Sequence, residues 1–125
     1  MTENDISFII IGFIFHVYNN LDPGLLESVY KAALMYELKN NNFNAKSQVT
    51  LPVHYKEIKL EVKFWLDLLV EDLVIIVIKS IEELKKVLYK QLMTYLKLST
   101  IKLGILVNFN TDDIRENIKR VANNL

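Results

Sequence analysis

The fold of this chain is decided by one stretch, which reads Phe64-Trp65-Leu66-Asp67-Leu68-Leu69-Val70-Glu71-Asp72-Leu73-Val74-Ile75-Ile76-Val77-Ile78-Lys79. Residues 64–70 and 73–78 are nearly continuous apolar runs, which are typical of strands that are covered on both faces. Two acidic residues separate the runs and predict a hairpin. Asp67 and Lys79 are charged residues within the strands, and burying a charge is costly unless it finds a partner. Both residues are therefore candidates for a functional site.

The length of the hairpin loop decides whether these two charges can meet. Side chains alternate between the faces of a sheet with period two, so a two-residue turn would send Asp67 and Lys79 to opposite faces. A three-residue loop at 71–73 would place Asp67 opposite Val77 and bring Lys79 to the same face. A site requires that longer loop or a bulge. A structural ion pair between Asp67 and Lys79 is the alternative to a site.

A first helix is expected from about Asn4 or Asp5, either of which can cap it, to about Asn19. Residues 6–18 within it are strongly apolar. The run follows Glu3 and Asp5 and not the basic residues of a signal peptide, and it is too short to span a bilayer comfortably. We therefore expect a helix buried against the sheet or at a homodimer interface, and no membrane partner.

A second helix is predicted after Asp22 and Pro23, because proline fits a first helical turn and aspartate can cap it. It should end near Lys39. Apolar residues recur along it at helical spacing: Leu26, Val29, Tyr30, Ala33, Leu34 and Leu38.

Gly24, Glu27 and Tyr30 are spaced by three and line one side of this second helix. Glu27 lies in the first turn, where the helix dipole favours a carboxylate. An ordinary first-turn acid beside a core tyrosine is the alternative to a functional constellation.

The remaining pattern predicts strands, a long helix and a last strand. Alternation from Ala45 predicts a strand in which Pro52 marks an edge or a bulge, and a second strand follows a turn at Lys56-Glu57. A helix is expected over 81–98, a strand over 102–109, and a short closing helix capped by Thr111 or Asp112. This order predicts an α/β (α+β) fold, with a mixed central sheet flanked by helices, in one domain over 1–125.

Gln91 and Tyr95 are four residues apart on the predicted third helix and border its apolar stripe. Their side chains either hydrogen-bond inward to a site or face water.

The amino-acid composition excludes several kinds of functional site. The chain has no cysteine, which removes disulfides, thiolate nucleophiles and cysteine-based zinc sites, and which is typical of a reducing compartment such as the cytoplasm. His16 and His54 lack metal-ligand spacing. Fifteen basic and fifteen acidic residues give a net charge of zero, so the overall charge gives no support to nucleic-acid binding.

The whole pattern resembles a known family. The segment from Gly24 to Tyr30 matches the motif of the GxxExxY proteins, which belong to the PD-(D/E)XK nuclease-like superfamily. The resemblance covers nearly the entire chain and continues through 67–72, 91–97 and 103–109. It implies a restriction-endonuclease-like core, in which the site lies at a split in the sheet.

The resemblance also implies a role for each candidate residue. Glu27 and Asp67 would hold a divalent metal, usually Mg²⁺, and Lys79 would orient water or stabilise charge at a phosphate of DNA or RNA. Gln91 and Tyr95 would help to build the site. Such a metal polarises the phosphodiester and helps to generate hydroxide.

The sequence departs from the family where its acid-x-lysine motif is expected. It has Val77 two residues before the lysine, Trp65 where an arginine is expected, and Tyr89 where many members have histidine. The leading interpretation is a degenerate nuclease with weak or absent Mg²⁺ binding, which retains binding to nucleic acid or to a protein. The alternatives are an active nuclease that recruits Glu61 or Glu82, and a non-enzymatic homodimeric interaction protein.

Overall fold

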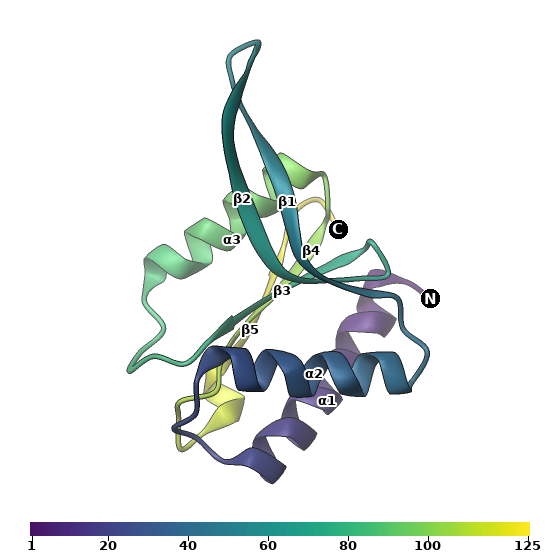
Figure 1. Ribbon diagram of the computed structural model, residues 1–125, viewed down its shortest axis with the longest axis vertical. Coiled ribbons are helices and arrows are strands. Elements are labelled where there is room, and N and C mark those ends of the chain that lie inside the picture. Colours follow the sequence, from purple (N-terminus) through teal and green to yellow (C-terminus); the bar gives the residue numbers. More distant parts are fainter.

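The computed structural model describes residues 1–125 as a mixed five-stranded sheet with helices on both faces (Figure 1). The elements are α1 (Glu3–Leu21), α2 (Glu27–Asn40), β1 (Ala45–Tyr55), β2 (Ile58–Val70), β3 (Val74–Lys79), α3 (Lys86–Ser99), β4 (Leu103–Asn108), the short 3-10 helix η1 (Ile114–Asn117) and β5 (Ile118–Ala122). The strands lie in chain order, β1-β2-β3-β4-β5. Only β3 and β4 pair in parallel, and α3 makes the crossover between them. The predicted fold class is confirmed.

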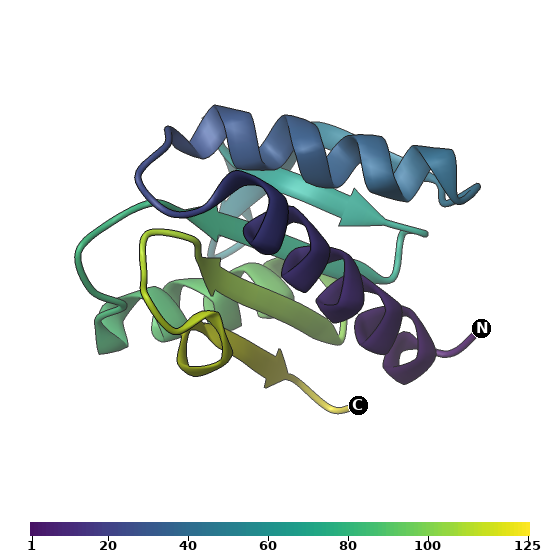
Figure 2. The same cartoon turned by 90° about the horizontal axis from the view of Figure 1, so that it is seen from below.

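Two hydrophobic cores lie on opposite faces of the sheet. α1 and α2 cover one face and α3 covers the other, an arrangement that can be followed in Figure 2. Val74, Ile76 and Ile78 of β3 belong to the first core, whereas Ile75 and Val77 belong to the second. This division explains why the apolar run of β3 is continuous.

α3 packs very closely on β4. A Cβ atom added to Gly104 would lie 2.7 Å from Cδ1 of Leu92. A larger residue at this position would push the helix or its leucine away from the sheet.

The β2–β3 hairpin has the three-residue loop that a shared face requires. Val70 pairs with Val74, and the Leu73 amide donates to the Val70 carbonyl at 2.9 Å. Continuing this register places residue 67 opposite residue 77. The β2–β3 ladder ends at the pair Leu68–Ile76, so the two strands separate beyond it.

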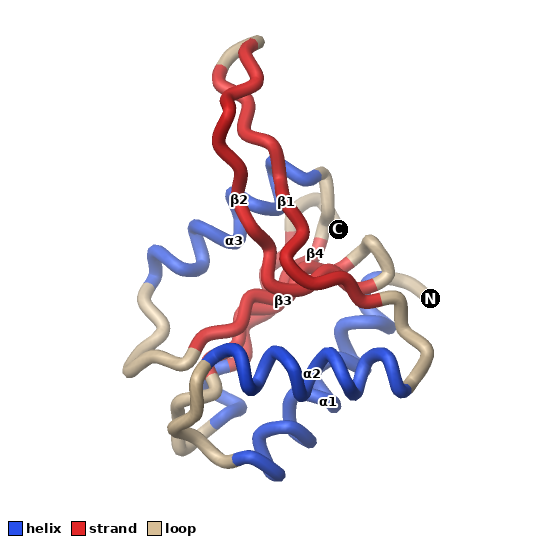
Figure 3. Tube along the Cα trace, viewed as in Figure 1, coloured by secondary structure: helices blue, strands red, loops and turns tan.

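The β1–β2 ladder continues where β3 stops. It runs out to the pair Tyr55–Ile58, through an irregularity in register at Pro52 and Val53. Residues 50–65, called the arm below, extend past the helices as a two-stranded ribbon (Figures 1 and 3). Pro52 was predicted to mark an edge or a bulge, and it lies in the edge strand β1 at this irregularity.

Two predicted helix starts were wrong. α1 begins at Glu3 and is capped by Thr2, whose hydroxyl accepts from the Asp5 amide. Asp5 completes this cap from within the helix by accepting from the Thr2 amide. α2 begins at Glu27, because Gly24 has a positive φ of 102° that ends any helix continuing from Pro23.

The third helix and the C-terminus also differ from the prediction. α3 begins at Lys86 and not at Ile81, since the Ile81 amide and carbonyl are both bonded to the Asn108 side chain. The closing helix is one 3-10 turn, capped by Asp113 and not by Thr111 or Asp112. The edge strand β5 follows it and was not predicted. It pairs with β4, an interaction that local sequence does not reveal.

None of the helices combines the length and hydropathy that a bilayer crossing requires. α1 instead places Ile6, Ile10, Ile14 and Val17 in the core, which confirms the predicted packing against the sheet.

Candidate functional site

The GxxExxY motif shapes the loop between α1 and α2. The Tyr30 hydroxyl donates to the Asp22 carbonyl at 2.7 Å and accepts from the Leu25 amide at 3.1 Å. Its ring is fully buried and stacks on Phe109, with ring centroids 4.4 Å apart. Gly24 supplies the left-handed backbone that this loop needs. Two motif residues therefore fix the loop that leads into Glu27.

Glu27 lies beside the end of β3. Its Oε1 accepts from the Ser80 amide at 3.2 Å, and the Ser80 hydroxyl donates to the Leu25 carbonyl at 2.6 Å. A shallow, open pocket here is lined by Leu25, Leu26, Glu27, Ser28 and Ser80. The motif acid is thus held one residue beyond Lys79.

Asp67 lies where β2 leaves β3. Its half-buried carboxylate accepts from the Ile78 amide through Oδ2 at 2.8 Å. The carboxylate therefore accepts a backbone N–H of β3 just beyond the last β2–β3 pair, where no backbone carbonyl of β2 pairs with β3. Asp67 is bonded to the amide before Lys79 and Glu27 to the amide after it. The two acids therefore bind backbone amides on either side of Lys79, at the end of β3.

Lys79 is half-buried and forms no ion pair. A direct structural pair with Asp67 therefore does not account for these two charges. Their proximity through a water molecule stays a prediction.

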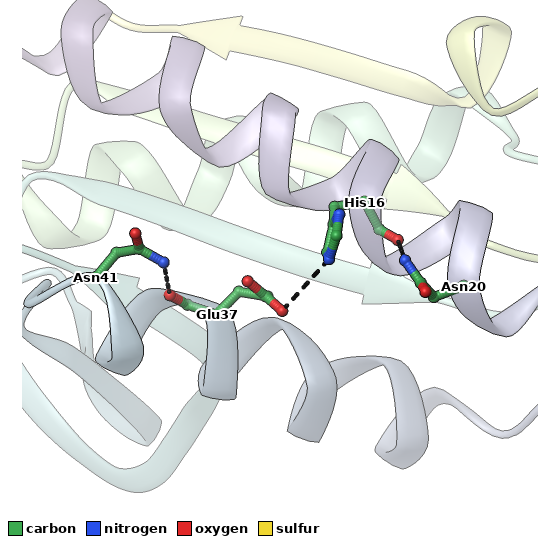
Figure 4. Close-up of polar contacts among 4 residues, drawn as sticks. All are labelled: His16, Asn20, Glu37 and Asn41. Carbon is green, nitrogen blue, oxygen red and sulfur yellow. Dashed lines mark hydrogen bonds and ion pairs between the residues drawn. The ribbon is translucent and has the colours of Figure 1, made fainter.

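The ion pairs of the chain lie elsewhere. Lys46 pairs with Asp72 at 3.0 Å. His16 of α1 approaches Glu37 of α2 with Nε2 and Oε1 3.8 Å apart, as Figure 4 shows. Asn20 and Asn41 donate to the His16 and Glu37 carbonyls. This contact joins the two helices at the surface, away from the acids at the end of β3.

Tyr95 and Gln91 have different surroundings. Tyr95 is buried under the base of the arm, with its ring centroid 5.3 Å from that of Phe64. Burial raises the pKa of the Tyr95 hydroxyl, and the negative charge of Asp67 raises it further. Gln91 is exposed, and its side chain forms no hydrogen bond to another residue. The structure therefore brings Tyr95, and not Gln91, into the electrostatic field of Asp67.

Val77 occupies the position where the sequence resemblance predicts an acid. It is only 6% exposed and belongs to the α3-side core with Leu92, Tyr95, Leu96 and Leu106. The side chain at this position is therefore part of the hydrophobic packing.

The acids present do not gather into a cluster of three or more potential metal ligands. No group of three or more His, Cys, Asp or Glu side chains is arranged to hold a metal ion. Glu61 lies exposed on the arm and Glu82 lies exposed in the loop after β3, and neither completes such a group. Mg²⁺ demands near-octahedral oxygen coordination. Glu27 and Asp67 each already accept from a backbone amide, so these two carboxylates offer Mg²⁺ only part of such a coordination shell.

Ser80 and Asn108 organise the site and were not anticipated. Asn108 is fully buried, and its Oδ1 accepts from the amides of Ile81 and Asn110 at 3.0 and 3.2 Å. Its Nδ2 donates to the Ile81 carbonyl at 2.9 Å. A polar residue ending the apolar run 103–107 was the available signal, because a buried amide needs partners.

Comparisons with known proteins agree with this architecture. The crystal structure of SSO0001 superposes with a TM-score of 0.59 at 24% identity, over 78% of this chain and 50% of that one. The likeness shows the fold alone, and this chain spans half the length of SSO0001. No curated protein matches the sequence. The narrower resemblance to GxxExxY proteins stays a prediction. The model of the PD-(D/E)XK nuclease superfamily matches residues 4–121, and the chain therefore belongs to that superfamily.

Proposed function

We propose that this chain is a catalytically degenerate PD-(D/E)XK protein that binds nucleic acid without hydrolysing it. The observation that carries the proposal is Val77, which is packed into the α3-side core at the position of a motif acid.

The two acids that the candidate site retains, Asp67 and Glu27, are hydrogen-bonded to backbone amides. One oxygen of Asp67 accepts from the Ile78 amide, and one oxygen of Glu27 accepts from the Ser80 amide. Hydrolysis in this superfamily commonly depends on a metal, and loss of one charge-stabilising group from such a site costs about 100-fold to 1,000-fold in rate. Glu27 and Asp67 therefore serve mainly to fix the end of β3.

Binding does not require that metal. Lys79 is a cation without an acidic partner at the end of β3, where the superfamily places its phosphate-facing lysine. Phosphate contacts through lysine give sequence-independent, salt-dependent affinity. Superfamily membership supports nucleic acid as the ligand.

Binding and cleavage assays on the same oligonucleotides test the proposal. We expect single- and double-stranded DNA and RNA to remain intact in millimolar Mg²⁺, and at least one of them to bind in chelator. Calorimetric titration with Mg²⁺ should give no saturable heat. Cleavage that requires Mg²⁺ and is abolished by Asp67→Ala would instead establish an active enzyme, with Glu61 or Glu82 as the candidate recruited acid. Absence of binding to every oligonucleotide would refute the binding role.

A homodimeric interaction protein is the second candidate, and one observation favours it. Phe8 on the outward face of α1 is 80% exposed, and nothing lies within 4 Å of a Cβ atom added to Gly12, one turn further along. Sedimentation over a range of protein concentrations tests it. A dimer that Phe8→Glu dissociates would support this function, and a monomer at all concentrations would reject it.

A further inference from the structure

The arm has two chemically different faces. Directly paired residues of antiparallel strands place their side chains on the same face. One face is apolar and is formed by the pairs Val53–Leu60 and Tyr55–Ile58. The opposite face, called the polar face below, is formed by the pairs His54–Lys59, Pro52–Lys63 and Thr50–Trp65.

The polar face exposes the only tryptophan of the chain. Trp65 is 62% exposed, although an indole is among the side chains that gain most from burial. Lys63 lies two residues away on the same strand and Lys59 lies farther toward the tip, and neither forms an ion pair. Glu61 is the acid on this strand segment. Unpaired lysines on the same face as an exposed aromatic ring are complementary to a polyanion with flat bases.

We propose that the polar face of the arm binds single-stranded nucleic acid, with Trp65 stacking on a base and with Lys59 and Lys63 contacting phosphates. A single strand is favoured because only an unstacked base offers its face to an exposed indole. Lys59 and Lys63 are four residues apart on β2, on either side of the register irregularity, and Trp65 follows Lys63 by two residues, so all three lie along one extended strand.

This inference rests on the proposed function and says where the ligand lies. Asp67 follows Trp65 by two residues on β2. The base of the arm therefore adjoins the split between β2 and β3, where the nuclease fold has its site.

Fluorescence of the single tryptophan provides a direct test. Titration of the full chain with a short oligothymidylate, in chelator and low salt, should quench Trp65 emission to saturation. A duplex of the same length should bind more weakly and quench less. Equal binding of the duplex without any change in Trp65 emission would overturn the inference.

Variants measured by anisotropy of a labelled oligothymidylate locate the surface. Trp65→Ala should weaken binding roughly fivefold to a hundredfold, and Trp65→Phe should retain most of the affinity. Lys59→Gln with Lys63→Gln should reduce the slope of log affinity against log salt by about 1.4, because each single-strand phosphate contact contributes about 0.7. Glu61→Gln should strengthen binding.

A matched control distinguishes binding at the arm surface from an effect of the net charge of the protein on binding. Lys31→Gln with Lys39→Gln makes the same charge change on α2, at the opposite end of the molecule from the arm (Figure 1). This pair should leave affinity and salt slope unchanged. If the parent binds and the arm variants match it, the arm inference fails and the proposed function stands. If the parent binds no oligonucleotide, both fail.

Discussion

The proposed loss of activity depends on one residue, Val77, which is packed in the α3-side core. Val77→Glu would place a carboxylate beside Asp67, one position beyond the last β2–β3 pair, where both groups could share one cation. Without metal, repulsion and desolvation should make the variant roughly 2 to 4 kcal/mol less stable than the parent. Mg²⁺ should restore stability, because ligands that bind the native state shift the folding equilibrium. Thermal melts in chelator and in millimolar Mg²⁺ measure both effects.

The matched control for this variant is Val77→Gln. The amide has nearly the same shape as the carboxylate but no charge, so this variant should lose stability and stay insensitive to Mg²⁺. If the melting temperature of Val77→Glu also ignores Mg²⁺, residue 77 does not share a pocket with Asp67. The nuclease site would then not transfer to this chain.

The pKa of the Tyr95 hydroxyl depends on the charge of Asp67. Burial, and after it the charge of Asp67, raises the pKa of Tyr95 above its usual value of 10.0. The folded state therefore favours the neutral phenol. The stability that the neutral phenol contributes is fully present below pH 10.0 and is lost as pH rises through the higher folded pKa. Asp67→Asn should lower the folded pKa of Tyr95 without returning it to 10.0, since burial remains the larger cause. Absorbance titration of tyrosinate, compared with Tyr95→Phe, measures the shift. Tyr36→Phe, at a 65% exposed position, is the control that should leave the late-ionising group in place.

At the scale of elements, Tyr30 joins the start of α2 to the preceding loop. Tyr30→Phe removes the bonds to the Asp22 carbonyl and the Leu25 amide and should lower the free energy of unfolding by about 1 to 3 kcal/mol. Denaturant unfolding measures the change, and the exposed Tyr36→Phe should stay within about 0.5 kcal/mol of the parent. An equally small effect at Tyr30 would mean that the loop is fixed by Gly24 and not by the hydroxyl.

The sequence predicted the elements whose causes are local. Alternation and apolar runs located β1 to β4, and the spacing of apolar residues located the first two helices. The start of α3 was not predictable in this way, because Asn108 binds the Ile81 backbone from 27 residues away. β5 was missed for the same kind of reason, since it is stabilised by pairing with the edge of β4.

The candidate site was predictable in its residues but not in its bonding. Motif spacing selected Glu27, and charges within apolar runs selected Asp67 and Lys79. No local pattern indicated that both acids would accept from backbone amides that flank Lys79. Gln91 has the same helical spacing to Tyr95 as an inward pair would have, but it lies exposed beside the buried stripe of α3.

At the scale of the whole molecule, stability is concentrated in the middle of the sheet. β3 and β4 lie between the two cores, and nearly all of their residues are buried, whereas most arm residues beyond Leu51 are exposed. Amide hydrogen exchange should therefore be slowest in β3 and β4 and fast in 53–60. Equal protection of the arm tip in the free protein would indicate that a second chain already covers it.

The arm should be dispensable for folding. Replacement of 52–63 by Asn-Gly would join the paired residues Leu51 and Phe64 through a two-residue type I′ turn, which suits antiparallel strands. It keeps the contact between Phe64 and Tyr95 and removes a ribbon that is mostly solvent-exposed. The truncated protein should unfold within about 1 kcal/mol of the parent and should lose oligothymidylate binding, because Lys59 and Lys63 go with the ribbon. Calorimetric unfolding and anisotropy measure the two properties on one sample. A truncated chain that fails to fold would show that the arm contributes to the core, whereas a folded chain with unchanged affinity would place the nucleic acid elsewhere on the molecule.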